Sequence, residues 1–358
     1  MNYKDSEFYK NKNKQQIENF KKVCLALPDY AVNALKAKEF QIAYSSLIEY
    51  GRDLLTFFRY LKNNNPTLSE VETNAISVDI LCNLSEEDFL EYQSYLRLTN
   101  VDGVERTNNN KSIARKMTSL RNLYSYLKRK DYIENNILAD LPIPKYSNRK
   151  TEIIRLHSEP ENNELQAFLI GLEEILYSDR LSEHQKQFIA RDITRDTALL
   201  YLLLGTGIRV SECEGLDVSD VDLDTRCIRI KRKGGFFDVV YFNNDVKEKL
   251  EYYISTERTK EMINKYGPAL FLSAHKKRIT VDAIRDITEK YTLIICNKRL
   301  SPHKLRASYG TLLYSETKDI RLTADVLGHT NINTTVRYAA QLEENKRRAG
   351  SISLSKAD

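Results

Sequence analysis

The chain has 358 residues, about twice the length of an average domain, which predicts two domains. Hydrophobic residues make up 41% and charged residues 29%, a balance typical of globular proteins that excludes wholesale disorder. The 55 basic and 50 acidic side chains leave a formal net charge of +5, so total charge does not indicate a nucleic-acid partner and the distribution of charge has to be examined.

Membrane insertion and secretion are not indicated. No stretch approaches the roughly 18 consecutive apolar residues of a membrane span, and the polar N-terminus lacks the apolar run of a signal peptide. We therefore expect a cytoplasmic protein without a membrane partner. Five cysteines lie far apart without a C-x-x-C pair, which predicts reduced thiols rather than disulfides or a zinc site.

The first part of the chain predicts helices. Residues 1–40 have a helical composition that Pro28 interrupts, and we expect them to form an N-terminal helical extension. From Tyr44 to Leu61, apolar residues recur at steps of three and four, the spacing of one face of a helix. This segment therefore predicts an amphipathic helix that packs on one side.

Two more helices are expected before the middle of the chain. One runs from about Ser85, whose hydroxyl could cap it, to Leu96. The polar stretch 102–110 predicts a loop, and a further helix is expected over 111–129. Residues 41–139 should therefore form an all-helical bundle.

The expected helix over 111–129 is strongly basic. Residues 106–130 contain eight basic side chains and no acid, interleaved with apolar residues at helical spacing. Such a helix would pack on one face and present positive charge on the other, which suits a DNA backbone, although a basic run alone is more often a solvated face. The candidate DNA contacts in this segment are Lys111, Arg115, Lys116 and Arg121.

The second part of the chain predicts mixed structure. Residues 140–151 contain two prolines and several polar residues, which is typical of a linker, and residues 152–358 should form the second domain. Helices are expected over 164–177 and 195–204, whereas the alternation over 227–241 predicts a β-hairpin. We therefore expect a mainly α protein with a small β-sheet in its C-terminal domain.

The expected hairpin carries a second basic cluster. Arg232 is a further candidate DNA contact, and Lys233 directly precedes Gly234 and Gly235, where a turn lets a long side chain reach a phosphate. Alternation alone does not choose between Lys231 and Lys233, but the glycines favour Lys233. In isolation, a solvated turn lysine is the commoner explanation.

Two patches combine an arginine with a second polar residue at helical spacing. In GTGIRVSE, Arg209 and Glu212 should share a face at the start of a helix, and a surface ion pair is the simpler explanation. In SPHKLRASYG, Ser301 is a plausible N-cap, so His303 and Arg306 fall in the first turns, where free N–H groups and the helix dipole favour an anion. A packed histidine beside an exposed arginine is the alternative there.

The last patch is LGHTNINTTVRYAAQ. Leu327 and Gly328 should end one helix, His329 follows, and Thr334 or Thr335 could cap the next helix, which would contain Tyr338. A tyrosine at such a position more often packs than reacts.

In order and spacing, these patches resemble the active-site signature of the tyrosine recombinases, also called phage integrases. The resemblance covers about residues 194–341, and its wording is most similar to the Xer recombinases that act alone on chromosome dimers. It implies an N-terminal core-binding bundle that clamps DNA and an α+β catalytic domain. The implied catalytic residues are Arg209, Lys233, His303, Arg306, His329 and Tyr338, with Glu212 in support.

The resemblance also implies a reaction and its partners. Tyr338 would attack a DNA phosphodiester and form a 3′-phosphotyrosine, the two arginines would stabilise the growing charge, and Lys233 would protonate the departing oxygen. No metal or cofactor is expected. The partner would be double-stranded DNA with a specific recombination site, on which a homotetramer would join two sites. The outcome would be chromosome dimer resolution, or integration and excision of a mobile element.

Two other functions would be compatible with parts of this pattern. A type IB topoisomerase-like enzyme would share the tyrosine chemistry, but the short chain and the two histidines favour a recombinase. A catalytically silent DNA-binding protein of the same fold would be expected to have lost at least one of the six implied catalytic residues, and all six are present.

Overall fold

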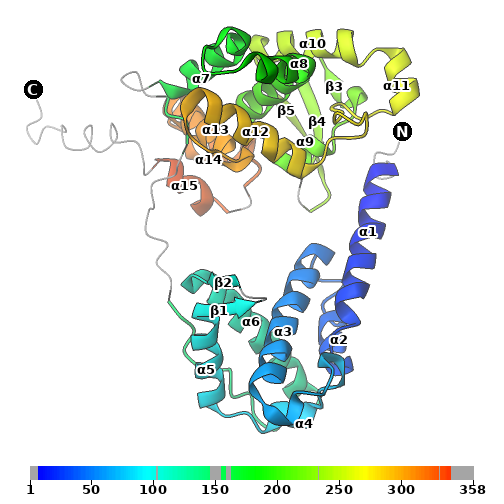
Figure 1. The fold of residues 1–358 in the computed structure, drawn as a ribbon, viewed down its shortest axis with the longest axis vertical. Coiled ribbons are helices and arrows are strands. Elements are labelled where there is room, and N and C mark those ends of the chain that lie inside the picture. The colour runs from blue at the N-terminus through cyan, green and yellow to red at the C-terminus, as the bar shows by residue number, and fades with distance from the viewer. Residues whose placement is uncertain are drawn as a thin grey trace, which may run out of the picture. The chain divides into compact units, whose positions relative to one another are not determined.

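The chain divides into two compact units, Met1–Asn148 and Arg149–Asp358 (Figure 1). The computed structural model describes residues 7–101, 104–145, 155–158, 163–232, 234–329 and 331–339, without the side chains of 99–106 and 337–339. Within these residues, no helix is long and apolar enough to cross a membrane.

Unit 1 is built mainly from helices. Its α-helices are α1 (Glu7–Cys24), α2 (Asp29–Lys36), α3 (Tyr44–Asn64), α4 (Val78–Cys82), α5 (Glu86–Arg97) and α6 (Asn110–Arg129). Short 3-10 turns, η2 (Pro66–Leu68) and η3 (Thr73–Ala75), follow α3. The helices expected from Tyr44, from Ser85 and over 111–129 are therefore confirmed as α3, α5 and α6.

A capping box fixes the start of α5. The hydroxyl of Ser85 accepts the backbone N–H of Asp88 at 3.3 Å, and the Asp88 carboxylate accepts the backbone N–H of Ser85 at 2.7 Å. Two N–H groups that the helix cannot use are thereby satisfied. The predicted cap at Ser85 is confirmed.

One hydrophobic core runs through unit 1 and includes its first two helices. Phe20 of α1 and Leu35 of α2 belong to the same buried cluster as Phe57 and Phe58 of α3. The predicted boundary at residue 40 therefore does not separate an extension from a bundle, because both sides of it contribute to a single core.

The predicted loop over 102–110 is partly wrong. β1 (Leu98–Val101) and β2 (Val104–Thr107) pair antiparallel, with Leu98 opposite Thr107 and Val101 opposite Val104. Asp-Gly between two short stretches containing β-branched residues is a strong hairpin signal in the sequence. The polar character of the segment obscured it.

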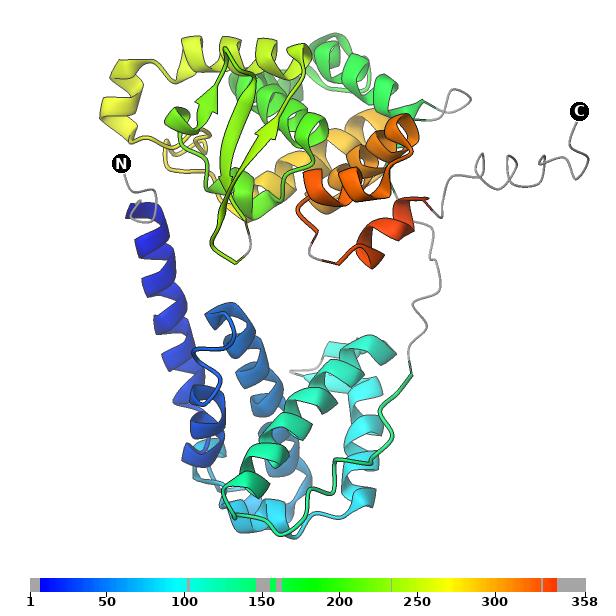
Figure 2. The ribbon, with the colours of Figure 1, turned by 180° about the vertical axis from the view of Figure 1, so that it is seen from behind.

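Unit 2 combines helices with a small sheet. Its α-helices are α7 (Glu164–Glu173), α8 (Glu183–Thr206), α9 (Val210–Glu214), α10 (Asn244–Glu257), α11 (Lys260–Tyr266), α12 (Val281–Cys296), α13 (Pro302–Thr317), α14 (Ile320–Val326) and α15 (Asn333–Ala339), and its 3-10 turns are η4 (Ile175–Tyr177) and η5 (Val218–Asp220). The strands β3 (Val221–Asp222), β4 (Cys227–Lys231) and β5 (Phe237–Tyr241) lie side by side in that order and pair antiparallel (Figure 2). The predicted hairpin and the mainly α fold class are confirmed.

Helix α8 forms the centre of unit 2. Its residues 198–204 are all buried, and it packs against α10 and α13. It begins twelve residues before the predicted start at Arg195, because a capping box of Ser182 and Gln185 starts a polar first half that carries little apolar periodicity. It ends where Gly207 takes a left-handed φ of 60° and closely approaches Tyr309, so a side chain at 207 would clash.

Candidate active site

The turn after α8 positions Arg209 and Glu212. Arg209 is the N-cap residue of α9, and its backbone N–H donates to Glu212 Oε2 at 2.7 Å. The Arg209 side chain donates from Nη1 to Glu212 Oε1 at 2.9 Å. Glu212 is buried, whereas the Arg209 side chain is 30% exposed. The predicted pairing of the two residues is confirmed, and it leaves part of Arg209 accessible to a ligand.

The start of α13 positions His303 and Arg306. Ser301 is the N-cap residue and Pro302 the first helical residue, although among the described residues the Ser301 hydroxyl makes no capping hydrogen bond. Arg306 is buried and donates from Nη1 to the carbonyl of Gly207 at 2.5 Å and from Nη2 to the carbonyl of Leu327. Its guanidinium therefore joins the ends of α8 and α14.

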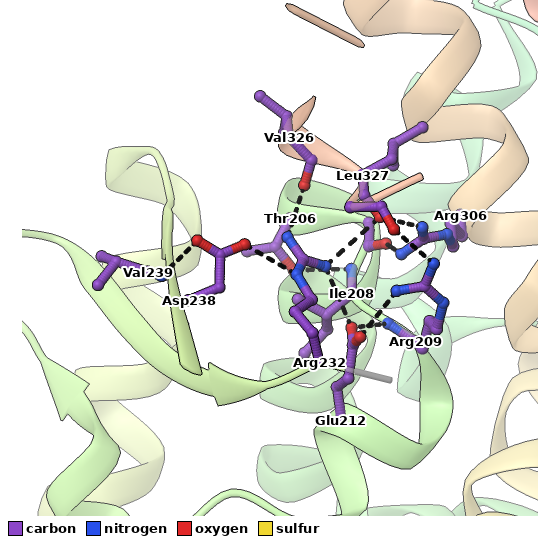
Figure 3. Close-up of polar contacts among 12 residues, drawn as sticks. Thr206, Ile208, Arg209, Glu212, Arg232, Asp238, Val239, Arg306, Val326 and Leu327 are labelled. Carbon is purple, nitrogen blue, oxygen red and sulfur yellow. Dashed lines mark hydrogen bonds and ion pairs between the residues drawn. The ribbon is translucent and has the colours of Figure 1, made fainter. Parts of the chain in front are cut away.

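The C-terminal end of α14 gathers three guanidiniums (Figure 3). The carbonyl of Val326 accepts from Arg232 Nη2 at 2.9 Å, and the carbonyl of Gly328 accepts from Arg209 Nη2 at 2.8 Å. The carbonyl of Leu327 accepts from Arg306. Carbonyls at a helix end have no partner within the helix and carry the negative end of its dipole, so they attract cations.

His329 lies directly after this helix end. Its backbone N–H donates to the carbonyl of Ala324 at 2.9 Å, and its Nδ1 lies 2.8 Å from Thr335 Oγ1. Burial, followed by the charges of Arg306 and Arg209, lowers the pKa of His329 to about 4. Burial and the nearby Arg306 also lower the pKa of His303. Both imidazoles are therefore neutral at pH 7 and can accept a proton or a hydrogen bond.

The start of α15 differs from the expectation. The helix begins at Asn333, whose backbone N–H donates to the side chain of Asn331 at 2.9 Å. Thr335 lies inside the helix rather than capping it, and its hydroxyl contacts His329 instead. The predicted cap at Thr334 or Thr335 was wrong, because an asparagine two residues upstream offers an oxygen to the first turn.

Two predicted catalytic residues cannot be positioned as side chains. Tyr338 lies in α15, but its side chain is outside the described part of the chain. Lys233 lies outside the described residues altogether. The structure brings together Arg209, Glu212 and Arg306 with the segment that ends at His329.

The charges at this site suit a phosphodiester. Arg209 and Arg232 pair with the carboxylate of Glu212, and Arg232 also pairs with that of Asp238. Arg306 donates to backbone carbonyls, so three guanidiniums and two carboxylates leave a formal excess of one positive charge among these described residues. A planar guanidinium matches the geometry of phosphate oxygens, and fixed cations stabilise charge that grows on those oxygens during displacement at phosphorus. The arrangement can therefore bind and activate a phosphodiester.

The predicted DNA contacts on α6 differ in their surroundings. Lys111 is exposed. Arg115 and Lys116 both contact the buried carboxylate of Asp53, at 2.6 and 3.4 Å, and the Ser119 hydroxyl donates to the same carboxylate at 2.8 Å. The Arg115 side chain is 42% exposed and that of Lys116 only 15%. Arg115 is therefore accessible to a ligand, and Lys116 much less so.

Two other predicted DNA contacts are occupied within the chain. Arg121 donates from Nε to the carbonyl of Leu138 at 2.8 Å and from Nη2 to that of Leu141 at 2.9 Å. Arg232 is 3% exposed, and its guanidinium is bonded to acceptors inside unit 2. The prediction that Arg232 is a surface DNA contact was wrong, because its side chain points inward to carboxylates and helix-end carbonyls instead of outward to solvent.

Sequence reasoning missed two functional candidates. Asp53 lies three residues after Tyr50 and four before Phe57, on the apolar face of α3, so an acid in that stripe was a detectable signal of a buried ion pair. Asp238, which pairs with Arg232 at 2.8 Å, gave no such signal, because strand alternation does not reveal that the Arg232 side chain turns inward.

Comparisons with known proteins agree on one family. The chain matches the description "Phage integrase family" over residues 179–345 and "Phage integrase, N-terminal SAM-like domain" over 35–131. Tyrosine recombinase XerS of Streptococcus equi subsp. zooepidemicus strain H70 is 28% identical, with 93% of this chain and 97% of the relative covered. XerS of Lactococcus lactis subsp. cremoris strain MG1363 is 27% identical, with 94% and 99% covered.

Solved structures share the fold. XerH site-specific recombinase bound to its palindromic difH substrate matches with a TM-score of 0.62 at 20% identity, covering 94% of both chains. The Tn1549 transposon integrase in complex with circular intermediate DNA also has a TM-score of 0.62, at 18% identity, with 92% of this chain and 99% of that one covered. The resemblance to Xer recombinases predicted from the sequence is confirmed by the family matches and the XerS relatives.

Proposed function

Because the chain belongs to the phage integrase family of tyrosine recombinases, enzymes of site-specific recombination, we propose that it cuts and rejoins duplex DNA through a 3′-phosphotyrosine on Tyr338. The observation that carries this proposal is the meeting of Arg209 and Arg306 at the C-terminal end of α14, directly before His329. Two fixed guanidiniums beside neutral imidazoles are what displacement at a phosphodiester needs.

The proposed reaction conserves bond energy. The phenol oxygen of Tyr338 attacks the phosphorus, the bond between phosphorus and the 5′ oxygen breaks, and the 5′ oxygen leaves with a proton from Lys233. The phenol proton passes to a neutral imidazole, for which His303 and His329 are the candidates. A 5′ hydroxyl from a second strand then reverses the step, so joining requires no nucleotide hydrolysis.

The assignment of Lys233 has a direct test. Lys233→Ala should slow cleavage of an ordinary phosphodiester but recover on a 5′-bridging phosphorothiolate, because sulfur leaves without a proton. The matched control is Lys231→Ala, which should show no such recovery. In the structure, the Lys231 ammonium lies 5.9 Å from the centroid of the Phe237 ring. Recovery of the Lys231 variant alone would move the acid role to that residue.

We propose DNA as the partner and a tetramer as the active assembly. Unit 1 would act as the clamp, with exposed Lys111 and accessible Arg115 on α6 meeting phosphates. XerH and the Tn1549 integrase, which share the fold, were solved with DNA, which supports this role for the present chain. Four copies would join two recombination sites in the cytoplasm.

We propose chromosome dimer resolution as the cellular role. XerS relatives match over almost the entire length of both chains, and this favours the chromosomal role over integration or excision of a mobile element. If the role is correct, deleting the gene should leave dimeric chromosomes that fail to separate at division. Normal segregation, together with loss of excision of a neighbouring element, would favour the alternative.

The chemical proposal is tested by covalent capture. The purified chain is mixed with sheared genomic DNA, denatured, and the DNA that stays attached to protein is sequenced. We expect one palindromic site to be enriched, and a nicked duplex of that site to trap the complex in good yield. Specific binding without any covalent attachment would instead support a catalytically silent DNA-binding protein.

A further inference from the structure

Arg232 directly follows strand β4 but sends its side chain into the interior of unit 2. Its backbone N–H donates to the carbonyl of Phe236 at 2.9 Å, and its carbonyl accepts from Gly235 at 3.0 Å, so the main chain closes the hairpin. The side chain is only 2% exposed and points toward α9 and the end of α14 (Figure 3). A group so deeply buried does not reach a DNA phosphate.

The guanidinium of Arg232 joins three elements. Nε donates to Asp238 Oδ2 on β5 at 2.8 Å, and Nη1 donates to Glu212 Oε2 on α9 at 3.4 Å. Nη2 donates to the carbonyl of Val326 at 2.9 Å, at the end of α14, and Nη1 lies 3.5 Å from the carbonyl of Leu327. One side chain therefore links the hairpin, the helix that holds Arg209 and the segment before His329.

Close packing reinforces this link. A Cβ built on Gly328 would lie 2.8 Å from both Cζ and Nε of Arg232, closer than real Cβ contacts. The arginine thus lies directly against the main chain at Gly328, where φ is 59°. The carbonyl of the same glycine accepts from Arg209 Nη2 at 2.8 Å.

We propose that Arg232 is a positioning residue that orients Arg209 toward the reacting phosphodiester. This inference rests on the proposed function. Arg232 is linked to both acceptors that hold the Arg209 guanidinium. It donates to the carboxylate of Glu212, and it packs against the Cα side of Gly328, the residue whose carbonyl accepts from Arg209. Fixing the acceptors fixes the donor, and a partly exposed arginine held at both Nη atoms is preorganised for phosphate.

Coupling to the hairpin gives the link a second consequence. Arg232 directly precedes Lys233, the proposed general acid, in the sequence. The bond from Arg232 to Asp238 therefore holds this part of the chain to β5, and the bond to the carbonyl of Val326 ties it to the segment that carries His329. A displacement of the hairpin should therefore change the position of the Arg209 guanidinium.

The first test separates positioning from stability. Arg232→Met keeps most of the side-chain volume and removes the guanidinium. We expect single-turnover cleavage of a nicked site to fall about 10- to 100-fold with unchanged DNA affinity, because small misplacement of a reacting group has effects of that size. The matched control is Arg258→Met, which removes an equally buried guanidinium that donates to the carbonyls of Ala269 and Gly267 away from the site.

The control defines what a structural role would give. Arg258→Met should lower the unfolding temperature yet cleave at the normal rate at a temperature where both variants are folded. Equal rates for the two variants under those conditions would overturn the proposal.

A double-mutant cycle tests whether Arg232 acts through Arg209. On an Arg209→Ala background, Arg232→Met should cause no further loss of cleavage, because the group that it orients is absent. Losses that multiply would show an independent role and contradict the inference.

Hydrogen exchange tests the link without any chemistry. The amides of Gly328 and His329 donate to the carbonyls of Asp325 and Ala324 at 2.7 and 2.9 Å. Arg232→Met and the more conservative Asp238→Asn, which is distant in sequence from α14, should both speed exchange at these two amides. This measurement does not depend on the proposed function: if the wild-type chain forms no covalent complex, that function fails, but the exchange rates still test the link that Arg232 makes to the end of α14. Unchanged exchange at both amides in both variants would overturn that link.

Discussion

The imidazole of His329 should titrate far below its ordinary range. Burial and the charges of Arg306 and Arg209 hold the pKa of His329 at about 4, against 6.5 for a free histidine. We expect a proton NMR titration of the full chain to show one imidazole titrating near pH 4, and His329→Gln to remove that resonance. The glutamine keeps a group that can bond the Thr335 hydroxyl, so the local contact is retained.

The same depression makes folding stability depend on pH. The pKa of His329 is lower in the folded chain than in the unfolded chain, so the unfolded chain binds the proton more readily. The stability associated with the neutral His329 imidazole is therefore fully present above pH 6.5 and is lost as the pH falls toward 4. The difference corresponds to roughly 3 kcal/mol, and we take about 2 kcal/mol because the ring is only half-buried and solvent screens its neighbours. Between pH 7 and pH 4, the wild-type chain should therefore lose about 2 kcal/mol more unfolding free energy than His329→Gln.

Comparison with the variant cancels the carboxylates that titrate in the same range. Urea unfolding at the two pH values, followed in the transition of unit 2, gives the required free energies. Titration of His329 near pH 6.5, with equal losses of stability in both proteins, would refute the burial of this imidazole among the arginines.

Three further outcomes are expected. Arg306→Ala should lower the cleavage rate far more than the DNA affinity. Lys111→Ala should instead weaken DNA binding and reduce its salt dependence by roughly one unit of log–log slope, and equal losses of affinity in the two variants would contradict this division. Asp53→Asn should lower the unfolding free energy by roughly 1–3 kcal/mol, because charged hydrogen bonds to a buried carboxylate are lost, and an unchanged denaturation midpoint would refute it. Ser85→Ala should cost about 1 kcal/mol through the lost cap, measured in the same way, and a change confined to unit 2 would be inconsistent with it.

Local rules were enough to predict much of the molecule. The cap at Ser85, the strand alternation from Cys227 and the pairing of Arg209 with Glu212 all depend on residues a few positions apart. Interactions at that range can be predicted from the sequence, because helix and strand geometry fix which neighbouring side chains contact each other.

Interactions between distant segments were not predictable in the same way. Arg232 belongs to a basic run that suggests a DNA surface, yet its acceptors at Val326 and Leu327 are more than ninety positions away. Nothing in the local pattern reveals that the end of α14 presents carbonyls to it. The buried role of Arg232 therefore follows from tertiary packing. The contact between His329 and Thr335 spans only six positions, but helix periodicity does not predict it, because His329 lies outside a helix.

The central claim is that Tyr338 forms the covalent bond to DNA. The most direct measurement is mass spectrometry of the peptide that stays attached to a nicked duplex of the recombination site after denaturation and proteolysis, run beside Tyr338→Phe. We predict that the attached peptide contains Tyr338 as its modified residue, and that the phenylalanine variant binds the duplex but leaves no attached peptide. An attached peptide in that variant, or one modified at another tyrosine such as Tyr314, would contradict the account.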